Sequence, residues 1–268
     1  MLKSTGGINL FTQNYFVDKP VGNILLVHGL AEHCGRYAHV ADALNKIGLN
    51  VYSFDLRGHG KSDGPRAFVK SIDEFREDVE VVYNSIPKDL PTFILGHSLG
   101  GLITLNFLMF RERTDIDGVI FSGAALEIGE DITPFTQKVV TFLAKIAPKL
   151  PTVKLDPKTV SRDLKEVEKY ANDPLNYHGG TKAGLGLAML NGINKLKSQF
   201  KDFTYPVLIM HGEGDKLANP EGSKALYSQC TSTDKTLKIW DGAFHEIFNE
   251  INKNEIIQYT THWIKERI

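Results

Sequence analysis

Short runs of aliphatic and β-branched residues recur along the chain and stop at turn-forming residues such as glycine, aspartate and serine. Runs of this kind are typical of strands that are buried on both faces of a sheet. The predicted strands are residues 24–27, 51–54, 92–95, 119–121, 207–210 and 236–239. Residues 8–17, which precede the first run, are expected to add an antiparallel edge strand.

The stretches between these runs have the apolar spacing of helices. The predicted helices are residues 36–47, 72–85, 99–111 and 222–230, with an amphipathic closing helix at residues 255–267. Strands that alternate with helices need right-handed crossover connections, which produce a parallel sheet covered by helices on both faces. The predicted fold class is therefore α/β, with an open, doubly wound and mostly parallel sheet.

One long interval, residues 126–203, breaks this alternation because it contains no strand-like run. Prolines divide it into short pieces at positions 134, 148, 151, 157 and 174. Such an interval is too long for a structureless loop in a compact domain. We therefore predict a helical cap at residues 126–203 over the C-terminal edge of the sheet, where open α/β sheets bind ligands. Residues 1–125 and 204–268 would form the core.

Residues 134–150 of this cap predict a helix with one apolar stripe. The stripe consists of Phe135, Val139, Phe142, Leu143 and Ile146, with lysines at positions 138, 145 and 149 beside it. Such a helix fits two roles equally. One is transient contact with a membrane or lipid surface. The other is packing on the domain, with the lysines extended at the edge of the stripe.

Composition and charge narrow the function classes. The 268 residues carry 31 Lys and Arg against 32 Asp and Glu, without a long basic block, which argues against nucleic acid as a partner. No secretion signal is apparent, and no apolar run approaches the roughly 18 residues of a membrane span. Cys34 and Cys230 are the only cysteines, so no disulfide framework is expected. We expect the protein to be cytoplasmic. This location is compatible with peripheral attachment to membranes or lipid droplets.

The strongest chemical signal is the sequence Gly-His-Ser-Leu-Gly-Gly at residues 96–101, between a predicted strand and a predicted apolar helix. A serine in a sharp strand-to-helix turn needs flanking residues without a Cβ, because its backbone lies close to neighbouring elements. Gly96 and Gly100 meet this need, so Ser98 is the predicted nucleophile. The alternative is a glycine-rich turn whose serine has no chemical role.

A serine nucleophile needs a histidine to take its proton and a carboxylate to orient that histidine. In proteins with this elbow both follow the serine along the chain, the acid first. Asp215 and His245 each follow a later predicted strand, so they reach the same sheet edge as Ser98. Glu213 and Asp241 are rival acids in the same two loops, and Asp215 is favoured over both.

The tetrahedral intermediate of ester hydrolysis needs two N–H donors aimed at its oxyanion. The backbone N–H of Leu99 is one candidate, because it follows the nucleophile and lies at a helix N-terminus. The second candidate is the N–H of Leu30, in the loop after the first predicted strand. His28 in that loop is expected to have a structural role.

Several segments together resemble the monoacylglycerol lipases of the serine α/β-hydrolases, over nearly the whole chain. They are HGLAEHCGRY (residues 28–37), DLRGHGKS (55–62), GHSLGG (96–101), SR (161–162), NDPL (172–175) and the loops of the predicted acid and histidine. The resemblance implies an α/β-hydrolase fold with a cap over an acyl tunnel. It also implies hydrolysis of monoacylglycerols without a metal or cofactor.

The resemblance further implies that the glycerol end of the site is formed by Glu32, Arg36, His97 and Tyr170. Hydroxyl groups of a glyceryl leaving group need such donors and acceptors. The alternative for Glu32 and Arg36, which are four residues apart, is a solvated ion pair. Leu30 is bulkier than the small residue of mammalian members and would narrow the alcohol side, whereas Leu99 replaces a common methionine without consequence for its N–H.

The predicted function is therefore a serine ester hydrolase that cleaves monoacylglycerols to glycerol and fatty acid through an acyl-enzyme on Ser98. Its partner would be a monoacylglycerol or a related lipid ester. A lysophospholipase or a general carboxylesterase with the same triad is the alternative. A non-catalytic receptor for a small ligand is a more remote one.

Overall fold

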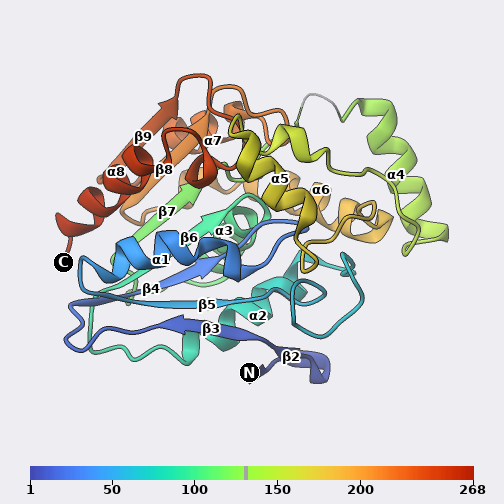
Figure 1. Cartoon of the computed structure of the whole chain (residues 1–268). Helices are drawn as coiled ribbons and strands as arrows, with labels where there is room; N and C mark the ends of the chain where they lie inside the picture. The colour runs from blue at the N-terminus through green and yellow to red at the C-terminus, as the bar shows by residue number, and fades with distance from the viewer. Residues whose placement is uncertain (130–131) are drawn as a thin grey trace.

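A seven-stranded sheet forms the centre of the computed structural model, which describes residues 1–129 and 132–268 (Figure 1). In spatial order the strands are β3 (Thr12–Tyr15), β5 (Leu49–Phe54), β4 (Gly22–Val27), β6 (Thr92–His97), β7 (Gly118–Ser122), β8 (Val207–Gly212) and β9 (Lys235–Trp240). Every neighbouring pair is parallel except β3 and β5. The predicted mostly parallel α/β sheet is confirmed, including its antiparallel edge.

The N-terminal edge is shorter than predicted. Only β3, the second half of residues 8–17, joins the main sheet. The first half contributes β2 (Asn9–Leu10), which pairs with β1 (Leu2–Lys3) in a separate two-stranded sheet. The residues of β1 and β2 alternate between more and less buried positions, which is the pattern of a surface hairpin and not of a buried strand.

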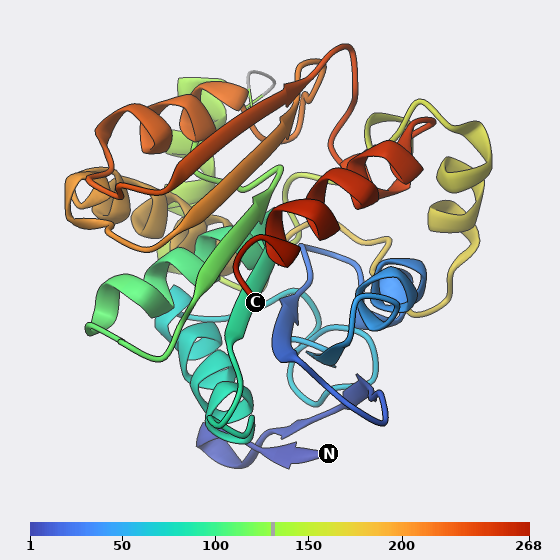
Figure 2. The same ribbon diagram turned by 90° about the vertical axis from the view of Figure 1, so that its left-hand side faces the viewer.

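Helices cover both faces of the sheet, as predicted (Figure 2). On one face lie α1 (Ala38–Asn45) and α8 (Lys253–Lys265), and on the other lie α2 (Ile72–Asn84), α3 (Leu99–Phe110) and α7 (Pro220–Gln229). Alternate residues of one strand serve the two faces, because successive side chains point to opposite sides. In β6, Phe93 and Leu95 pack with α1 and α8, whereas Ile94 packs with α2 and α3.

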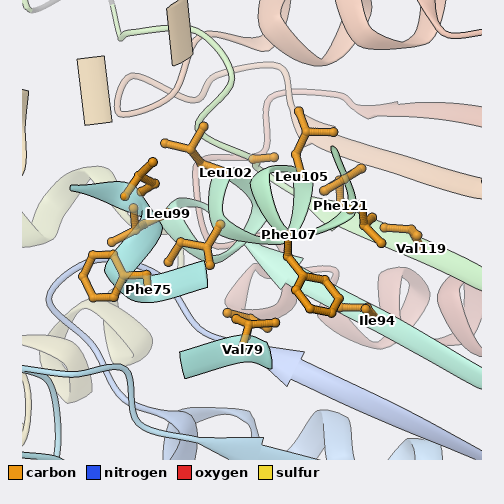
Figure 3. Packing of buried hydrophobic residues seen from close by; sticks show 14 of the residues in the cluster. Phe75, Val79, Ile94, Leu99, Leu102, Leu105, Phe107, Val119 and Phe121 are labelled. Atoms are coloured by element: carbon orange, nitrogen blue, oxygen red, sulfur yellow. The ribbon is translucent and has the colours of Figure 1, made fainter. Parts of the chain in front are cut away.

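The apolar cluster under α2 and α3 fixes the helix that follows the predicted nucleophile. Figure 3 shows Leu99 of α3 beside Phe75 of α2, and Phe107 of α3 beside Val79 of α2 and Ile94 of β6. Ten of the twelve residues of α3, from Leu99 to Leu108, are buried, so the helix is apolar on all sides. Its N-terminus is therefore held rigidly at the C-terminal end of β6.

The interval 126–203 contains α4 (Pro134–Ile146), α5 (Leu164–Asn172) and α6 (Ala183–Lys197), and its described residues form no strand. α4 packs on α6, which in turn packs on α3. These helices lie together over one end of the sheet, with α4 outermost (Figure 1). α4 ends earlier than the predicted residue 150, because Ala147 precedes Pro148 and such a residue avoids helical backbone angles.

Candidate active site

Ser98 occupies a sharp turn between β6 and α3. Its φ of 53° and ψ of −119° lie in a strained region for a residue with a Cβ. A Cβ on Gly96 would lie 2.7 Å from the carbonyl oxygen of Gly100, and one on Gly100 would lie 2.1 Å from that of Val27. The turn therefore needs glycine at both positions, which is the steric requirement expected from the sequence.

Three side chains from three loops meet at this turn. His245 Nε2 lies 2.8 Å from Ser98 Oγ, and His245 Nδ1 lies 2.7 Å from Asp215 Oδ2. Ser98 follows β6, Asp215 follows β8 and His245 follows β9, so parallel strands bring them to one sheet edge. All three residues are buried. The structure thus brings together the three residues that the sequence nominates as nucleophile, acid and base.

Asp215 is held as a carboxylate by four donors. Its Oδ1 accepts from the backbone N–H groups of Leu217 at 2.8 Å and Ala218 at 3.0 Å. Its Oδ2 lies 3.0 Å from His211 Nε2 as well as close to His245. Burial alone would raise the pKa of Asp215, but the two histidines outweigh it and hold that pKa well below its ordinary range.

The proton positions on His245 follow from this carboxylate. An ionised carboxylate only accepts hydrogen bonds, so Nδ1 carries the proton and Nε2 is left to accept from the Ser98 hydroxyl. Burial would lower the pKa of His245, but the carboxylate of Asp215 outweighs that effect and raises it above 6.5. The arrangement can remove a proton from Ser98 and stabilise the imidazolium that results.

The rival acids lie elsewhere. Asp241 is exposed to solvent. Glu213 is also exposed, and its Oε2 accepts from the backbone N–H of Gly242 at 3.0 Å. It therefore joins the acid loop to the histidine loop, in keeping with the turn role expected for it.

The loop after β4 lies against the nucleophile. A Cβ on Gly29 would lie 3.1 Å from Ser98 Cβ, so the next residue, Leu30, is beside the reaction centre. The Leu30 N–H has no backbone or side-chain acceptor within residues 1–129 and 132–268. Leu99 is the first residue of α3, where N–H groups have no acceptor inside the helix. Both candidate oxyanion donors are thus available beside Ser98.

His28 has the structural role expected for it. It is fully buried, its Nδ1 lies 2.8 Å from the carbonyl oxygen of Gly29, and its Nε2 accepts from the backbone N–H of Leu56 at 2.9 Å. Burial lowers its pKa to about 4, so the ring is neutral. His28 therefore braces the loop that carries Leu30.

Arg36 forms a buried ion-pair network instead of a solvated pair. Its Nη1 donates to Glu32 at 2.8 Å, and its two terminal nitrogens donate to both oxygens of Glu246, at 2.6 and 2.7 Å. Glu32 Oε1 also accepts from the N–H of Gly29 at 2.6 Å and from the Tyr37 hydroxyl at 2.7 Å. The expected Glu32–Arg36 pair exists, but it is buried because Glu246 completes it from the histidine loop.

His97 and Tyr170, the other two residues expected at a glycerol site, are also buried. The His97 ring is centred 4.9 Å from that of His245, and burial together with His245 lowers its pKa to about 4. The Tyr170 hydroxyl donates to the carbonyl oxygen of Ala31 at 3.4 Å. A neutral imidazole and a phenol are therefore both next to the loop that carries Leu30.

A cavity of about 280 Å³ contains the reaction centre. Its polar end is lined by Glu32, His97, Ser98, Tyr170, His245 and Glu246. Its other end is lined mainly by apolar residues of the interval 126–203, including Ile128, Ile132, Val140, Leu190 and Ile193. Arg36 lines a separate surface groove between α1, α5 and α8. Of the four residues expected to contact glycerol, Arg36 alone does not line the cavity.

Two functional candidates, Glu246 and His211, are not found by reasoning from the sequence. Glu246 follows His245 directly, and His211 is four residues before Asp215, so proximity to the loop motifs is the only available signal. The importance of Glu246 comes from a partner far along the chain, Arg36, which is 210 residues away. His211 has near partners, Asp215 and Ser223, and its importance comes from its burial between them, with Ser223 Oγ 2.7 Å from its Nδ1.

Comparison with known proteins matches residues 18–252 to the family described as serine aminopeptidase, S33. The monoacylglycerol lipase of Mycolicibacterium smegmatis is 35% identical over 263 residues, which cover 97% of this chain and 94% of that protein. The crystal structure of Paleococcus ferrophilus monoacylglycerol lipase matches with a TM-score of 0.89 at 32% identity, over 97% of this chain and 100% of that chain. A soluble variant of Saccharomyces cerevisiae monoglyceride lipase, solved with a substrate analogue, matches with a TM-score of 0.88 at 25% identity, over 100% and 94% of the two chains.

Proposed function

The chain belongs to the serine aminopeptidase S33 family of α/β-hydrolases, and from this membership we propose that it hydrolyses monoacylglycerols to glycerol and a fatty acid. It is a serine hydrolase by family. The observation that carries the proposal is the hydrogen-bonded series Ser98–His245–Asp215, which opens into a cavity that is polar at one end and apolar at the other. The resemblance to monoacylglycerol lipases over nearly the full chain supports the substrate.

Acylation follows from the hydrogen bonds of the triad. Ser98 Oγ attacks the ester carbonyl while its proton passes to His245 Nε2, 2.8 Å away. Asp215 keeps His245 in the required tautomer and stabilises the imidazolium. The N–H groups of Leu30 and Leu99 stabilise the negative charge that develops on the carbonyl oxygen. His245 then gives its proton to the departing glycerol oxygen.

Deacylation repeats these steps with water in place of Ser98. His245 Nε2 removes a proton from the water molecule, which attacks the acyl-enzyme, and the proton returns to Ser98 as the fatty acid leaves. Neither step needs a metal or an organic cofactor, because the attacking and leaving oxygens exchange protons only with His245.

The two ends of the cavity match the two parts of a monoacylglycerol. The apolar end under α4 and α6 suits an acyl chain, which gains free energy by leaving water. The polar end offers acceptors from Glu32 and Glu246 and the hydroxyl of Tyr170 to the glycerol hydroxyls. A site with buried polar groups discriminates against esters that leave those groups unpaired.

A panel of four esters tests this function. Long-chain monoacylglycerol, lysophosphatidylcholine, triacylglycerol and a short nitrophenyl ester are compared for hydrolysis by wild type, Ser98→Ala and the exposed-serine control Ser228→Ala. We expect preference for monoacylglycerol in wild type and the control, and a loss of at least about 10³-fold in Ser98→Ala. Activity on the nitrophenyl ester alone would keep the triad and exclude the lipase. Full activity of Ser98→Ala would exclude the triad.

We further propose that α4 contacts the lipid surface that supplies the substrate. Most of its apolar stripe faces outward, with exposures of 74% for Phe135, 62% for Phe142 and 64% for Ile146. Leu143 is half-buried, so only a small part of the stripe packs on the domain. Val140 is the one buried residue of this helix. None of the helices in the described part of the chain combines the length and apolar character that spanning a membrane requires. Contact through the side of α4 therefore suits this chain.

Vesicle binding tests the contact. Phe135→Glu with Phe142→Glu is expected to reduce co-sedimentation with phosphatidylcholine–phosphatidylglycerol vesicles by about tenfold or more, because apolar area is lost and charge added. Phe16→Glu is the matched control, since Phe16 is also 62% exposed and lies outside the cap. Equal loss in the control, or no loss in the double variant, would exclude α4 as the contact.

A further inference from the structure

At the polar end of the active-site cavity, negatively charged side chains outnumber positively charged ones. Glu32 and Glu246 line the cavity beside Ser98, whereas Arg36, the guanidinium that they share, lines the surface groove on the other side. A molecule at the polar end therefore meets two carboxylates in front of one cation, and the further charged residues that line the cavity, Lys154, Lys216, Glu127 and Asp156, are two of each sign. Three other titratable residues line this end: His97, which burial keeps neutral by lowering its pKa to about 4, Tyr170, whose pKa burial raises, and the base His245.

Both carboxylates act only as hydrogen-bond acceptors in this network. The pKa of Glu246 would be raised by its burial, but the guanidinium of Arg36 outweighs that effect and lowers it to about 2. Glu32 accepts hydrogen bonds at both of its oxygens, from the N–H of Gly29, the Tyr37 hydroxyl and Arg36. Two negative charges against one positive charge leave the cluster with a net charge of −1.

We propose that this cluster selects the alcohol part of the substrate by charge, and that Glu246 is the residue that determines this specificity. Neutral polyol esters and esters of cationic alcohols are accepted, whereas esters of phosphate-bearing alcohols are rejected. The inference rests on the proposed function, because it concerns the leaving alcohol of the same reaction. It adds to that function a class of esters, those of phosphate-bearing alcohols, that the site discriminates against.

Glu246 determines this specificity because it takes up hydrogen-bond donors of the Arg36 guanidinium. It binds the guanidinium through both oxygens, at 2.6 and 2.7 Å, and its Oε2 also accepts from the side-chain amide of Asn249 at 2.9 Å. A guanidinium with free N–H groups at this position would bind phosphate through paired hydrogen bonds. With Glu246 in place those donors are taken, and the excess charge repels a phosphate in the cavity.

A matched set of decanoyl esters tests the proposal. The three substrates are decanoylglycerol, decanoylcholine and decanoylglycerol 3-phosphate, which share the acyl chain and differ in the charge of the alcohol. For wild type we expect similar kcat/KM for the first two and a value on the order of 100-fold lower for the phosphate, as repulsion between charges roughly 6 Å apart implies. A phosphate ester cleaved within about tenfold of decanoylglycerol would overturn the proposal.

Variants assign the effect to Glu246. In Glu246→Gln the ratio of glycerol ester to phosphate ester should fall by about tenfold or more, whereas Glu246→Asp, which keeps the charge, should retain most of the wild-type ratio. An unchanged ratio in Glu246→Gln, or an equal fall in Glu246→Asp, would overturn the assignment. If Glu246→Gln does not fold, Glu32→Gln removes the same charge from the other side of Arg36 and is expected to lower the same ratio.

Failure of this proposal is distinguishable from failure of the proposed function. If decanoylglycerol is cleaved in a Ser98-dependent reaction and the phosphate ester is cleaved equally fast, the charge selection alone is wrong. If wild type cleaves none of the three esters, the proposed function is wrong and the charge selection falls with it.

Discussion

Asp215 Oδ2 lies within hydrogen-bond distance of two histidines, which makes the tautomer of His245 depend on this one oxygen. In Asp215→Asn an amide N–H₂ group can replace that oxygen. His245 would then turn its unprotonated nitrogen toward the amide, leaving a protonated Nε2 that cannot accept from Ser98. We expect kcat to fall by about 10⁴-fold with little change in stability.

The two rival acids supply the control for that substitution. Asp241→Asn and Glu213→Gln alter exposed carboxylates in the same loops, so their kcat should stay within about threefold of wild type. Steady-state kinetics with thermal unfolding of each variant make the comparison. A large loss in Asp241→Asn with an active Asp215→Asn would mean that the acid has been misassigned.

The pH dependence of hydrolysis reports the protonation of His245. The base must be neutral, and Asp215 holds its pKa above 6.5. Activity is therefore lost as pH falls through a value above 6.5, and it is full only at higher pH. A profile of kcat/KM should show one acid limb with its midpoint above pH 6.5. A midpoint below 6.5 would contradict the environment described for His245.

Residues with a local signature could be predicted, and those defined by distant partners could not. Ser98, Asp215 and His245 follow strands that share an edge, so their meeting is implied by the strand order. The roles of Glu246 and His211 depend on burial and on partners elsewhere, and these are properties of the folded chain. An isolated Glu after His245 looks like any surface acid in the sequence.

At the scale of elements, strands were the easiest to predict, because short aliphatic runs bounded by turn-forming residues are typical of strands in a covered sheet. All six predicted strands of the parallel part exist, five inside the sheet and β9 at one edge, with ends shifted by up to two residues. The opposite edge was harder, because β3 has only half-buried and exposed residues and no aliphatic run. The pairing of β1 with β2 depends on a turn at residues 5–7, in which both glycines, Gly6 and Gly7, have positive φ.

The first turn of α2 offers a test of stability at this scale. Ser71 Oγ accepts from the N–H of Asp73 at 3.2 Å, and Glu74 Oε1 accepts from the N–H of Ser71 at 3.3 Å, which forms a capping box. Ser71→Ala should lower the free energy of unfolding by about 1 kcal/mol. Asn84→Ala, an exposed site in the last turn of the helix, is the control and should change it by less than about 0.5 kcal/mol. Equal effects in urea titrations would exclude a capping role for Ser71.

At the scale of the whole molecule, part of the interval 126–203 is hydrogen-bonded directly to the catalytic loops. The N–H of Tyr177 donates to the carbonyl oxygen of Ala31 at 2.9 Å, and the N–H of Glu246 donates to that of Val160 at 2.7 Å. Arg162 adds an ion pair with Glu250 at 2.9 Å. The segment around α5 therefore fixes the loops that carry Leu30 and His245, so the interval 126–203 and the loops of the sheet together build the polar end of the cavity.

Buried neutral histidines link the stability of the whole fold to pH. His28, His59 and His97 are fully buried, and burial lowers their pKa values to about 4, 3 and 4. The unfolded chain binds protons at these residues near pH 6.5. The contribution of these three histidines to stability is consequently complete only above pH 6.5, and each of them removes about 2 kcal/mol of stability when the pH falls to 5.

His59→Asn tests this linkage, because asparagine does not titrate and its amide can still donate to the carbonyl oxygen of Arg57, as His59 Nδ1 does at 3.1 Å. The substitution should cost stability at pH 7.5, where wild type retains its packing. Between pH 7.5 and pH 5 wild type loses the linkage contribution of His59 and the variant does not, so the difference between their free energies of unfolding should change by about 2 kcal/mol in favour of the variant. Urea titrations at both pH values measure it, and a difference independent of pH would mean that His59 is not held neutral by the fold.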